Sequence, residues 1–326
     1  MGRGNPGLTA SKRVRPEGAP GTREVTMTNE VLNRAPGLQP PALGKPAKLA
    51  YRAGLAVLFL ACALAVFLFG SNYYKAFPTN GSAAYAAVLS AVFLAAAMLL
   101  KRSQALAAYW RIAYAFFVAA VVNLVSALFG GYNAAFARAL GFSTSGNAFL
   151  AIAKIYEAAL VVIPILALIR LSGADLGSVL IKRGDLKWGL GMGALVLFSF
   201  ATSALIFHGT GYSMDALGSA IAWGTVFAFS NGLLEELWFR SLFLKRFTPV
   251  IGATGSILVT SLWFAAIHAL GVAYLPAVTI PIFLVNTFTL GIACGLLMHK
   301  TDSIWGAVLI HAAADLYLFI AMLAVR

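Results

Sequence analysis

Two adjacent glutamates and an arginine interrupt a long apolar stretch of this sequence. Glu235, Glu236 and Arg240 lie within residues 220–244, and about 20 apolar residues are enough to cross a bilayer. Each ionisable side chain at the centre of such a helix costs about 2.5–3.5 kcal/mol, so this cluster indicates a functional site, with a purely structural charge cluster as the alternative. Glu236 and Arg240 are spaced for an ion pair on one helix face. Glu235 has no local partner, and a buried carboxylate is a candidate base for activating water.

Three more polar side chains occur in later apolar runs. His268 lies in one run, and His311 and Asp315 lie one helical turn apart in another. Counted at about 1.5 Å per residue from the cytosolic end of each helix, these residues and Glu235 fall in one layer about 12–18 Å deep. We therefore expect a single polar pocket inside the membrane. A lone intramembrane histidine also serves as a hydrogen-bonding group between helices, which is the structural alternative.

A fourth apolar run contains a lysine and a glutamate. Lys154 and Glu157 are three residues apart, so each can neutralise the other across one helical turn. A self-satisfied ion pair is the simplest interpretation. The alternative is a path for a substrate or for protons, which intramembrane charges often mark.

Composition indicates an all-α polytopic membrane protein. Of 326 residues, 60% are hydrophobic and 11% are charged, and the net charge is +13. The basic residues gather in the N-terminal region and in short loops without interleaved aromatic residues, which argues against a nucleic-acid partner. Apolar run length predicts nine transmembrane helices, at about 53–70, 83–100, 112–130, 148–169, 189–207, 220–244, 254–272, 277–298 and 303–324.

The distribution of basic residues predicts a cytosolic N-terminus. With this orientation, the outer loops and the C-terminus hold only Lys75, Arg138 and Arg326, while the cytosolic side holds Arg52, Lys101, Arg102, Arg111, Arg170, Lys182, Arg183, Lys187, Lys245, Arg246 and Lys300. The lipid bilayer is thus a predicted partner, and the bacterial plasma membrane is the expected location.

Three regions differ in character. Residues 1–48 contain seven of the twelve prolines and eight Lys or Arg against three Glu, which predicts a disordered basic cytosolic tail. Residues 49–185 are expected to form N-terminal transmembrane helices, and residues 186–326 the core that carries the chemistry. The segment Leu176 to Trp188 is interpreted either as an amphipathic stretch lying flat at the cytosolic interface or as a plain loop.

Four ordered motifs resemble those of the CPBP intramembrane proteases, the group that includes CAAX prenyl proteases, bacteriocin-processing proteins and Abi-like proteins. The likeness extends over about residues 186–320 and includes the stretch Lys300 to Trp305 that leads into the last helix. The motifs are Glu235-Glu236-x-x-x-Arg240, Phe264-x-x-x-His268, Phe288-x-x-Gly291-x-x-x-Gly295 and His311-x-x-x-Asp315.

The resemblance implies a helical endopeptidase that cuts within or near the membrane. It implies that Glu235 activates water with help from His268, and that His311 and Asp315 stabilise the oxyanion. Glu236, Arg240 and Phe264 would be structural or substrate-orienting residues. We expect no cofactor. Zinc bound by Glu235, His268 and His311 is the alternative, because these are zinc-type ligands, although the His-Glu-x-x-His signature is absent.

The predicted substrates are membrane-associated or CAAX-like proteins. Because the N-terminal region and the Ala-rich composition suggest a bacterial chain, where prenylated substrates are not expected, a peptide, pheromone or membrane protein is the preferred substrate. One alternative is a non-catalytic membrane scaffold or bacteriocin-immunity protein that keeps the pocket for binding. Another is a proton-coupled transporter, for which Lys154 and Glu157 would be central. A transporter predicts internal repeats, and none is convincing in this sequence.

Overall fold

Every element that the structure describes is helical, which confirms the predicted all-α fold. The computed structural model describes residues 1, 45–70, 79–209, 213–271 and 280–323, and no strand occurs among them. The helices, with π-helical segments η1 and η4 and 3₁₀ segments η2 and η3, are α2 (Lys45–Ala63), η1 (Leu64–Leu68), α3 (Thr79–Arg102), α4 (Trp110–Phe129), η2 (Gly130–Tyr132), α5 (Asn133–Ala139), α6 (Gly146–Leu171), η3 (Leu176–Val179), α7 (Leu186–His208), α8 (Met214–Glu235), η4 (Glu236–Ser241), α9 (Leu242–Gly271), α10 (Ile280–Thr301) and α11 (Trp305–Leu323).

Seven helical stretches are long and apolar enough to cross a membrane, as an integral membrane protein requires. One of them, Met214–Ala269, takes in two of the predicted spans, and the last predicted span corresponds to the shorter apolar helix Trp305–Ala321. Each predicted span coincides with a helix to within a few residues, except that the first helix begins at Lys45 and that residues 272, 277–279 and 324 lie outside the described part. The count of nine crossings stays a prediction.

A glycine breaks the long stretch between its two predicted spans. Gly252 has φ 82° and ψ 165°, which is not helical. This positive φ is costly for other residue types because their Cβ atom would meet the backbone. Pro249, three residues earlier, also disfavours a continuous helix. The interruption predicted between residues 244 and 254 is therefore confirmed.

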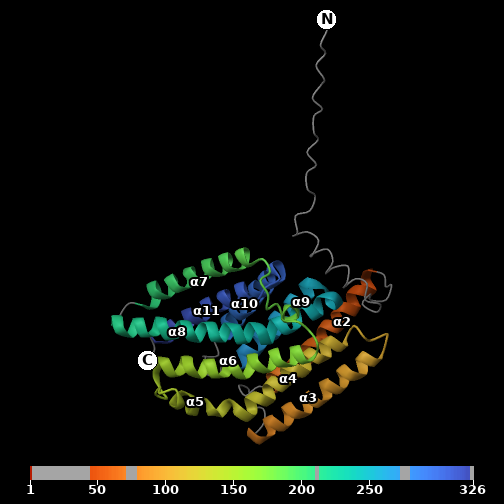
Figure 1. Cartoon of the computed structure of the whole chain (residues 1–326), viewed down its shortest axis with the longest axis horizontal. Helices are drawn as coiled ribbons and strands as arrows, with labels where there is room; N and C mark the ends of the chain where they lie inside the picture. Colours follow the sequence, from red (N-terminus) through yellow and green to blue (C-terminus); the bar gives the residue numbers. More distant parts are fainter. Residues whose placement is uncertain (2–44, 71–78, 210–212, 272–279, 324–326) are drawn as a thin grey trace.

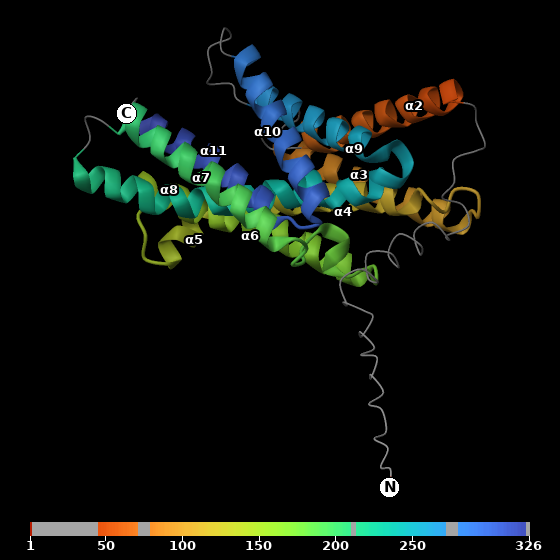
Figure 2. The same ribbon diagram turned by 90° about the horizontal axis from the view of Figure 1, so that it is seen from above.

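The helices lie side by side in a fixed order (Figure 1). α7 packs on α11, α11 on α8, α8 on α6, α6 on α4 and α4 on α3. The turned view shows α2, α9 and α10 gathered on another side of this row (Figure 2), where α9 contacts both α2 and α10. The helices that carry the four motifs, α8 to α11, are thus direct neighbours.

An aromatic cluster joins the N-terminal helices to the motif helices. Phe67 of η1 and Phe116 of α4 lie 5.9 Å and 4.9 Å, between ring centroids, from Phe243 of α9. The indole of Trp263 lies 5.0 Å from Phe243. Fully burying one such side chain contributes about 1.5–3 kcal/mol. Packing therefore crosses the predicted boundary at residue 185, and the division into two regions stays a prediction.

The segment Leu176–Trp188 is a loop bound into the protein. It contains the short η3, and Val179 and Leu180 are buried. The Ser241 hydroxyl donates to the Val179 carbonyl, and the Ile304 amide donates to the Leu180 carbonyl. These bonds tie the loop to η4 and to the start of α11. The segment therefore packs into the protein, and its last three residues begin α7. Its position at the cytosolic interface stays a prediction.

The first helix begins earlier than predicted. Residues 2–44 of the predicted disordered tail lie outside the described residues, but α2 begins at Lys45, whereas the first span was predicted at residue 53. Pro46 suits the first turn of a helix, where its missing amide hydrogen is not needed. Lys45 and Lys48 can extend their charged ends towards the membrane surface, so their charges did not prevent the helix.

Candidate active site

Glu235 lies between imidazole rings from two other helices. Its Oε2 atom is 3.3 Å from Nε2 of His268 and 3.3 Å from Nε2 of His311. Glu235 ends α8, His268 lies near the end of α9, and His311 lies in α11. The convergence of these residues, predicted from their depth, is confirmed. Both contacts are ion pairs without hydrogen-bond geometry. Oε2 therefore has no hydrogen-bond partner among the described residues and is available as an acceptor.

The ring orientation of His268 is set by its own helix. Its Nδ1 atom lies 2.8 Å from the carbonyl oxygen of Phe264, one turn earlier. A carbonyl only accepts, so Nδ1 carries the hydrogen. The Nε2 atom is thereby directed at Glu235 and can accept a hydrogen when the ring is neutral.

Glu236 is the buried partner of His311. Nδ1 of His311 donates to Glu236 Oε1 over 2.6 Å, and Arg240 donates to the same oxygen. The side chains of Glu236 and Arg240 are 0% exposed. The ion pair predicted from their spacing is therefore present, and it has a second task, because Glu236 also fixes the orientation of the His311 ring.

Asp315 lies near His311, its neighbour one turn away, as an ion pair and not as a hydrogen-bond partner. Its Oδ2 atom is 3.8 Å from His311 Nε2, too far for a hydrogen bond. The same oxygen instead accepts a hydrogen from Nδ2 of Asn231 over 2.9 Å. This hydrogen bond links α11 to α8.

Asn231 is the site residue that sequence reasoning missed. It lies in α8 one turn before Glu235 and is buried. Residues four apart share a helix face, so an amide at this position points to the same side as the glutamate. That spacing was the available signal. A buried asparagine in a membrane helix is usually interpreted as packing between helices, which is why it carried no functional prediction.

A π-helical segment begins at the second of the two glutamates. η4 runs from Glu236 to Ser241, directly after Glu235, and all six of its residues are buried. A π-helix inserts an extra residue into a helical turn and is common at functional sites. Here the neighbouring carboxylates serve different partners, because Glu235 faces His268 while Glu236 faces Arg240.

Phe264 separates the charged groups. The Arg240 guanidinium lies 4.0 Å from its ring centroid, and the His268 and His311 ring centroids lie 4.1 Å and 5.7 Å away. A cation over an aromatic face is attracted by the ring's negative face. Phe264 is itself buried. Its position therefore fits the structural role that the resemblance implied.

Close approach of two helices brings His311 to the site. A Cβ atom added at Gly232 of α8 would lie 3.0 Å from the Val308 carbonyl oxygen and 3.4 Å from Cβ of His311. At Gly291, in the third motif, it would meet Ser261 Cβ at 2.9 Å and Arg240 Nη2 at 3.0 Å. Glycine at these positions leaves room for α11 and for the arginine.

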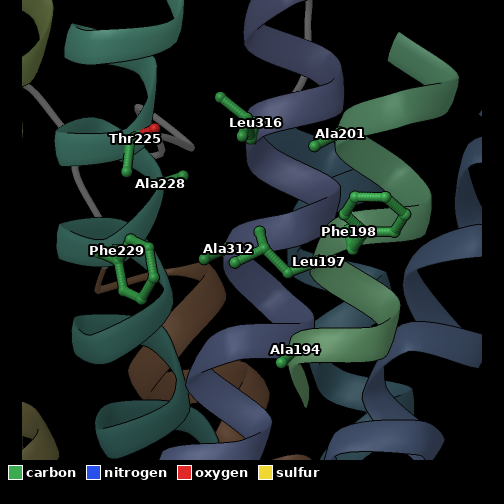
Figure 3. Close-up of a pocket in the computed structure, with 9 residues that line it drawn as sticks. All are labelled: Ala194, Leu197, Phe198, Ala201, Thr225, Ala228, Phe229, Ala312 and Leu316. Carbon is green, nitrogen blue, oxygen red and sulfur yellow. The ribbon is translucent and has the colours of Figure 1, made fainter. Parts of the chain in front are cut away.

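An apolar cavity of about 310 Å³ lies between α7, α8 and α11 (Figure 3). It runs beside the site, since Ala312 and Leu316 directly follow His311 and Asp315 in the chain. Among its nine lining residues only Thr225 has a polar side chain; the others are Ala194, Leu197, Phe198, Ala201, Ala228, Phe229, Ala312 and Leu316. The arrangement suits an apolar group.

Lys154 and Glu157 form the ion pair that the simpler interpretation predicted. Lys154 Nζ lies 2.6 Å from Glu157 Oε2, and it also lies 5.2 Å from the ring centroid of Phe227 in α8. Both contacts stabilise a cation that is largely removed from solvent. The pair lies on α6, which packs against α8, the helix that carries Glu235.

The donor set for zinc is of the right chemical kind, but its arrangement does not fit. Across residues 45–70, 79–209, 213–271 and 280–323, no group of three or more His, Cys, Asp or Glu side chains is placed to hold a metal ion. Glu235 approaches both imidazoles, but these three residues do not form such a group. The arrangement therefore supports chemistry by the side chains themselves.

These features define a helical membrane protein with a buried site of carboxylate and imidazole groups beside an apolar cavity. Residues 217–317 match the family model described as Type II CAAX prenyl endopeptidase Rce1-like. The match confirms the resemblance predicted from the motifs and supports an intramembrane protease. It extends from α8 into α11, so it includes Glu235, His268, His311 and Asp315 but is narrower than the predicted 186–320. No curated protein and no solved structure matches the chain.

Proposed function

We propose that the protein is an intramembrane endopeptidase in which Glu235 activates a water molecule. The observation that carries the proposal is the position of Glu235 Oε2, a buried acceptor 3.3 Å from both His268 and His311. A base must lie within hydrogen-bond reach of the proton that it removes. Because no protein group donates a hydrogen bond to Glu235 Oε2 among the described residues, this oxygen can accept a proton from water.

The reaction proceeds by proton transfers between these groups. Glu235 takes a proton from water as the oxygen attacks the peptide carbonyl carbon, and the carbonyl oxygen becomes an oxyanion. His268 Nε2 orients the water. Collapse of the tetrahedral intermediate breaks the C–N bond, and the proton on Glu235 passes to the leaving amine. The products are a carboxylic acid and an amine, whose exchange of one proton gives a carboxylate and an ammonium group, and the base is regenerated.

His311 contributes on the oxyanion side. Because Nδ1 donates to Glu236, an imidazolium presents Nε2–H to the space in front of Glu235, as a preorganised donor for developing negative charge. The carboxylate of Glu236 stabilises that imidazolium, and the ion pair with Arg240 holds Glu236 in place. Asp315, one turn further along α11, lies on the same side.

We propose a membrane-associated protein or peptide as the substrate, cut in the lipid bilayer. Prenylated CAAX sequences are the first candidates because the matching family is described by them. Such a substrate ends in a lipid-modified cysteine and three further residues. The apolar cavity beside His311 and Asp315 supports a substrate with an apolar group.

The experiment uses the purified full chain in liposomes with a fluorogenic peptide that ends in farnesylcysteine and three residues. The same peptide without farnesyl reports whether the lipid is needed. We expect Glu235→Gln to lower kcat by about 10²–10⁴-fold, because the amide keeps the volume but is not a base. Glu157→Gln, a matched change of a membrane carboxylate outside the site, should leave kcat within a few fold.

An unaffected Glu235→Gln enzyme would move the base elsewhere, with Glu236 as the next candidate. The cellular test compares the protein termini found in cells with the wild type and with Glu235→Ala. Termini that vanish with the variant identify substrates. An unchanged set, together with no cleavage of either peptide, would favour the non-catalytic scaffold.

A further inference from the structure

Two polar rungs connect α8 and α11 one turn apart. In one rung Glu235 faces His311, and in the other Asn231 donates to Asp315. Each pair of neighbours along a helix is four residues apart, which is a rise of about 6 Å. A peptide carbonyl and the water that attacks it together fit this spacing, so both rungs border the position of a bound scissile bond.

The hydrogen-bond capacity of the second rung is only partly used. The Asn231 amide nitrogen carries two hydrogens, and the structure gives a partner to one of them, Asp315 Oδ2. Within the described residues, the Asn231 Oδ1 atom is buried without a partner. Buried polar atoms usually have hydrogen-bond partners, because a buried atom without one costs free energy. An incompletely bonded amide at this position therefore indicates a function beyond packing.

Asp315 is poorly suited to stabilise an oxyanion itself. An ionised carboxylate has no hydrogen to donate, and a second negative charge beside an oxyanion is repulsive. The charged groups that act on Asp315 are His311, Glu235 and Lys154. Its one direct hydrogen-bond partner among the described residues is the neutral amide of Asn231. It also forms an ion pair with His311 at 3.8 Å, so it acts on the site through both groups.

We propose that Asn231 is a further catalytic residue, whose second Nδ2 hydrogen stabilises the oxyanion together with His311, and that Asp315 is the positioning residue that orients the amide. The proposal rests on the proposed function. The neutral oxyanion donor, Asn231, then lies on α8, the same helix that carries the base Glu235. Two donors from different helices then bracket the carbonyl oxygen.

A reciprocal exchange tests the pair. Wild type, Asn231→Leu, Asn231→Asp, Asp315→Asn and the double variant Asn231→Asp with Asp315→Asn are assayed in liposomes for kcat and KM on the farnesylated peptide. Thermal unfolding in detergent is measured in parallel. Asn123→Leu is the matched control, because Asn123 is a buried amide that donates to the Val66 carbonyl, in η1 outside the site.

We expect Asn231→Leu and Asn231→Asp to lower kcat by about 10²–10³-fold, as loss of one oxyanion donor does, with KM little changed. Asn231→Asp also places two carboxylates against each other. Asp315→Asn should keep most activity, since its amide oxygen still accepts from Asn231. The double variant restores an amide and a carboxylate with their helices exchanged, and should recover kcat to within about tenfold of wild type. Asn123→Leu should change stability and not kcat per folded molecule.

Three results would overturn the assignment. One is a kcat for Asn231→Leu within threefold of wild type. Another is a folded double variant no more active than Asn231→Asp. The third is unfolding of every Asn231 variant, which would make the pair structural. No hydrolysis by wild type would instead remove the proposed function, and this inference with it.

Discussion

At the scale of single residues, the site balances charge inside an apolar bundle. Glu236 accepts from both Arg240 and His311, so one buried anion is shared by two groups that can carry positive charge. Removing ions from water costs several kcal/mol each, and only good geometry offsets this cost. Arg240 gains further from the ring of Phe264. The arrangement leaves Glu235, the neighbouring carboxylate, without a cation of its own along the helix.

Replacing Arg240 should therefore lower the free energy of unfolding. Arg240→Leu leaves Glu236 buried with only His311 beside it, and breaking a buried pair in this way costs about 3–5 kcal/mol. Reversible unfolding in mixed micelles measures the difference. Arg170→Leu, a change of an exposed arginine in α6, should stay within about 0.5 kcal/mol. The double variant Glu236→Gln with Arg240→Leu should regain at least half of the loss, and an Arg240→Leu protein as stable as wild type would refute a structural role for the pair.

Hydrolysis should not require a metal ion. We expect kcat to survive treatment with 1,10-phenanthroline followed by removal of the chelator, with zinc far below one atom per chain by elemental analysis. The physical reason is that the mechanism assigns every proton transfer to side chains. 1,7-phenanthroline, which does not chelate zinc, controls for direct inhibition. Loss of activity on chelation and its recovery with added zinc would assign Glu235, His268 and His311 to a metal site.

The sequence predicted which residues lie close together in the site. It predicted less well which of them form hydrogen bonds with each other. Charge in an apolar run is costly, so Glu235, His268 and His311 could be selected, and helix depth placed them in one layer. Their hydrogen bonds depend on side-chain direction across helices, which spacing along one helix does not give. The hydrogen bond between His311 and Glu236, which lie on different helices, was therefore not predicted.

At the scale of elements, α8 approaches α11 through a row of small residues. Ala220, Gly224, Ala228 and Gly232 recur every four residues and are buried. Helices without large side chains at their contact can pack backbone against backbone. The π-helical turn that follows in η4 was not predicted, because an extra residue in one turn leaves the apolar pattern of a fully buried helix unchanged.

Gly232 gives a test of this close contact. In Gly232→Ala the new Cβ meets the Val308 carbonyl oxygen at 3.0 Å and the Ala312 amide nitrogen at 3.3 Å, both backbone atoms of α11. The helix must shift by a few tenths of an ångström and carry His311 with it. We expect kcat on the farnesylated peptide to fall about tenfold or more, since small displacements of reacting groups are costly.

The matched control for Gly232 lies in the same helix. Gly218 has no atom within 4 Å of an added Cβ, so Gly218→Ala should leave kcat unchanged and stabilise α8 by up to about 1 kcal/mol. Equal effects of the two substitutions on kcat would mean that helix propensity, and not the distance between α8 and α11, explains the change.

At the scale of the whole molecule, the site depends on more of the chain than the family match contains. The match covers residues 217–317, yet Phe67 and Phe116 pack against the helix that carries His268. The loop before α7 is bound to the same unit, since both Lys182 and Lys245 pair with Asp302. The N-terminal helices therefore support the geometry of the site from outside the motifs.

Basic and aromatic side chains gather at one end of the bundle. Lys101 and Arg111 lie 5.0 Å and 5.6 Å from the Trp110 ring centroid, and Lys300 lies 4.2 Å from that of Trp188. Tryptophan beside lysine and arginine is typical of a membrane–water interface. These cations belong to the set predicted to face the cytosol. The predicted outer residues Lys75 and Arg326 lie outside the described part, which leaves Arg138 in α5 as the marker of the other side.

Orientation can be measured with single cysteines in a Cys62→Ala, Cys294→Ala background. Arg102 and Arg138 are both exposed, at the end of α3 and in α5. Because lysine and arginine are retained on the cytosolic side, we expect Arg102→Cys to react with a membrane-impermeant maleimide only in inverted vesicles, and Arg138→Cys in intact cells. The reverse labelling would place Lys101 and its basic neighbours outside. The helix ends from which the depth of Glu235 was counted would then face the outside, so substrates on that side, and not in the cytosol, would lie nearest to the site.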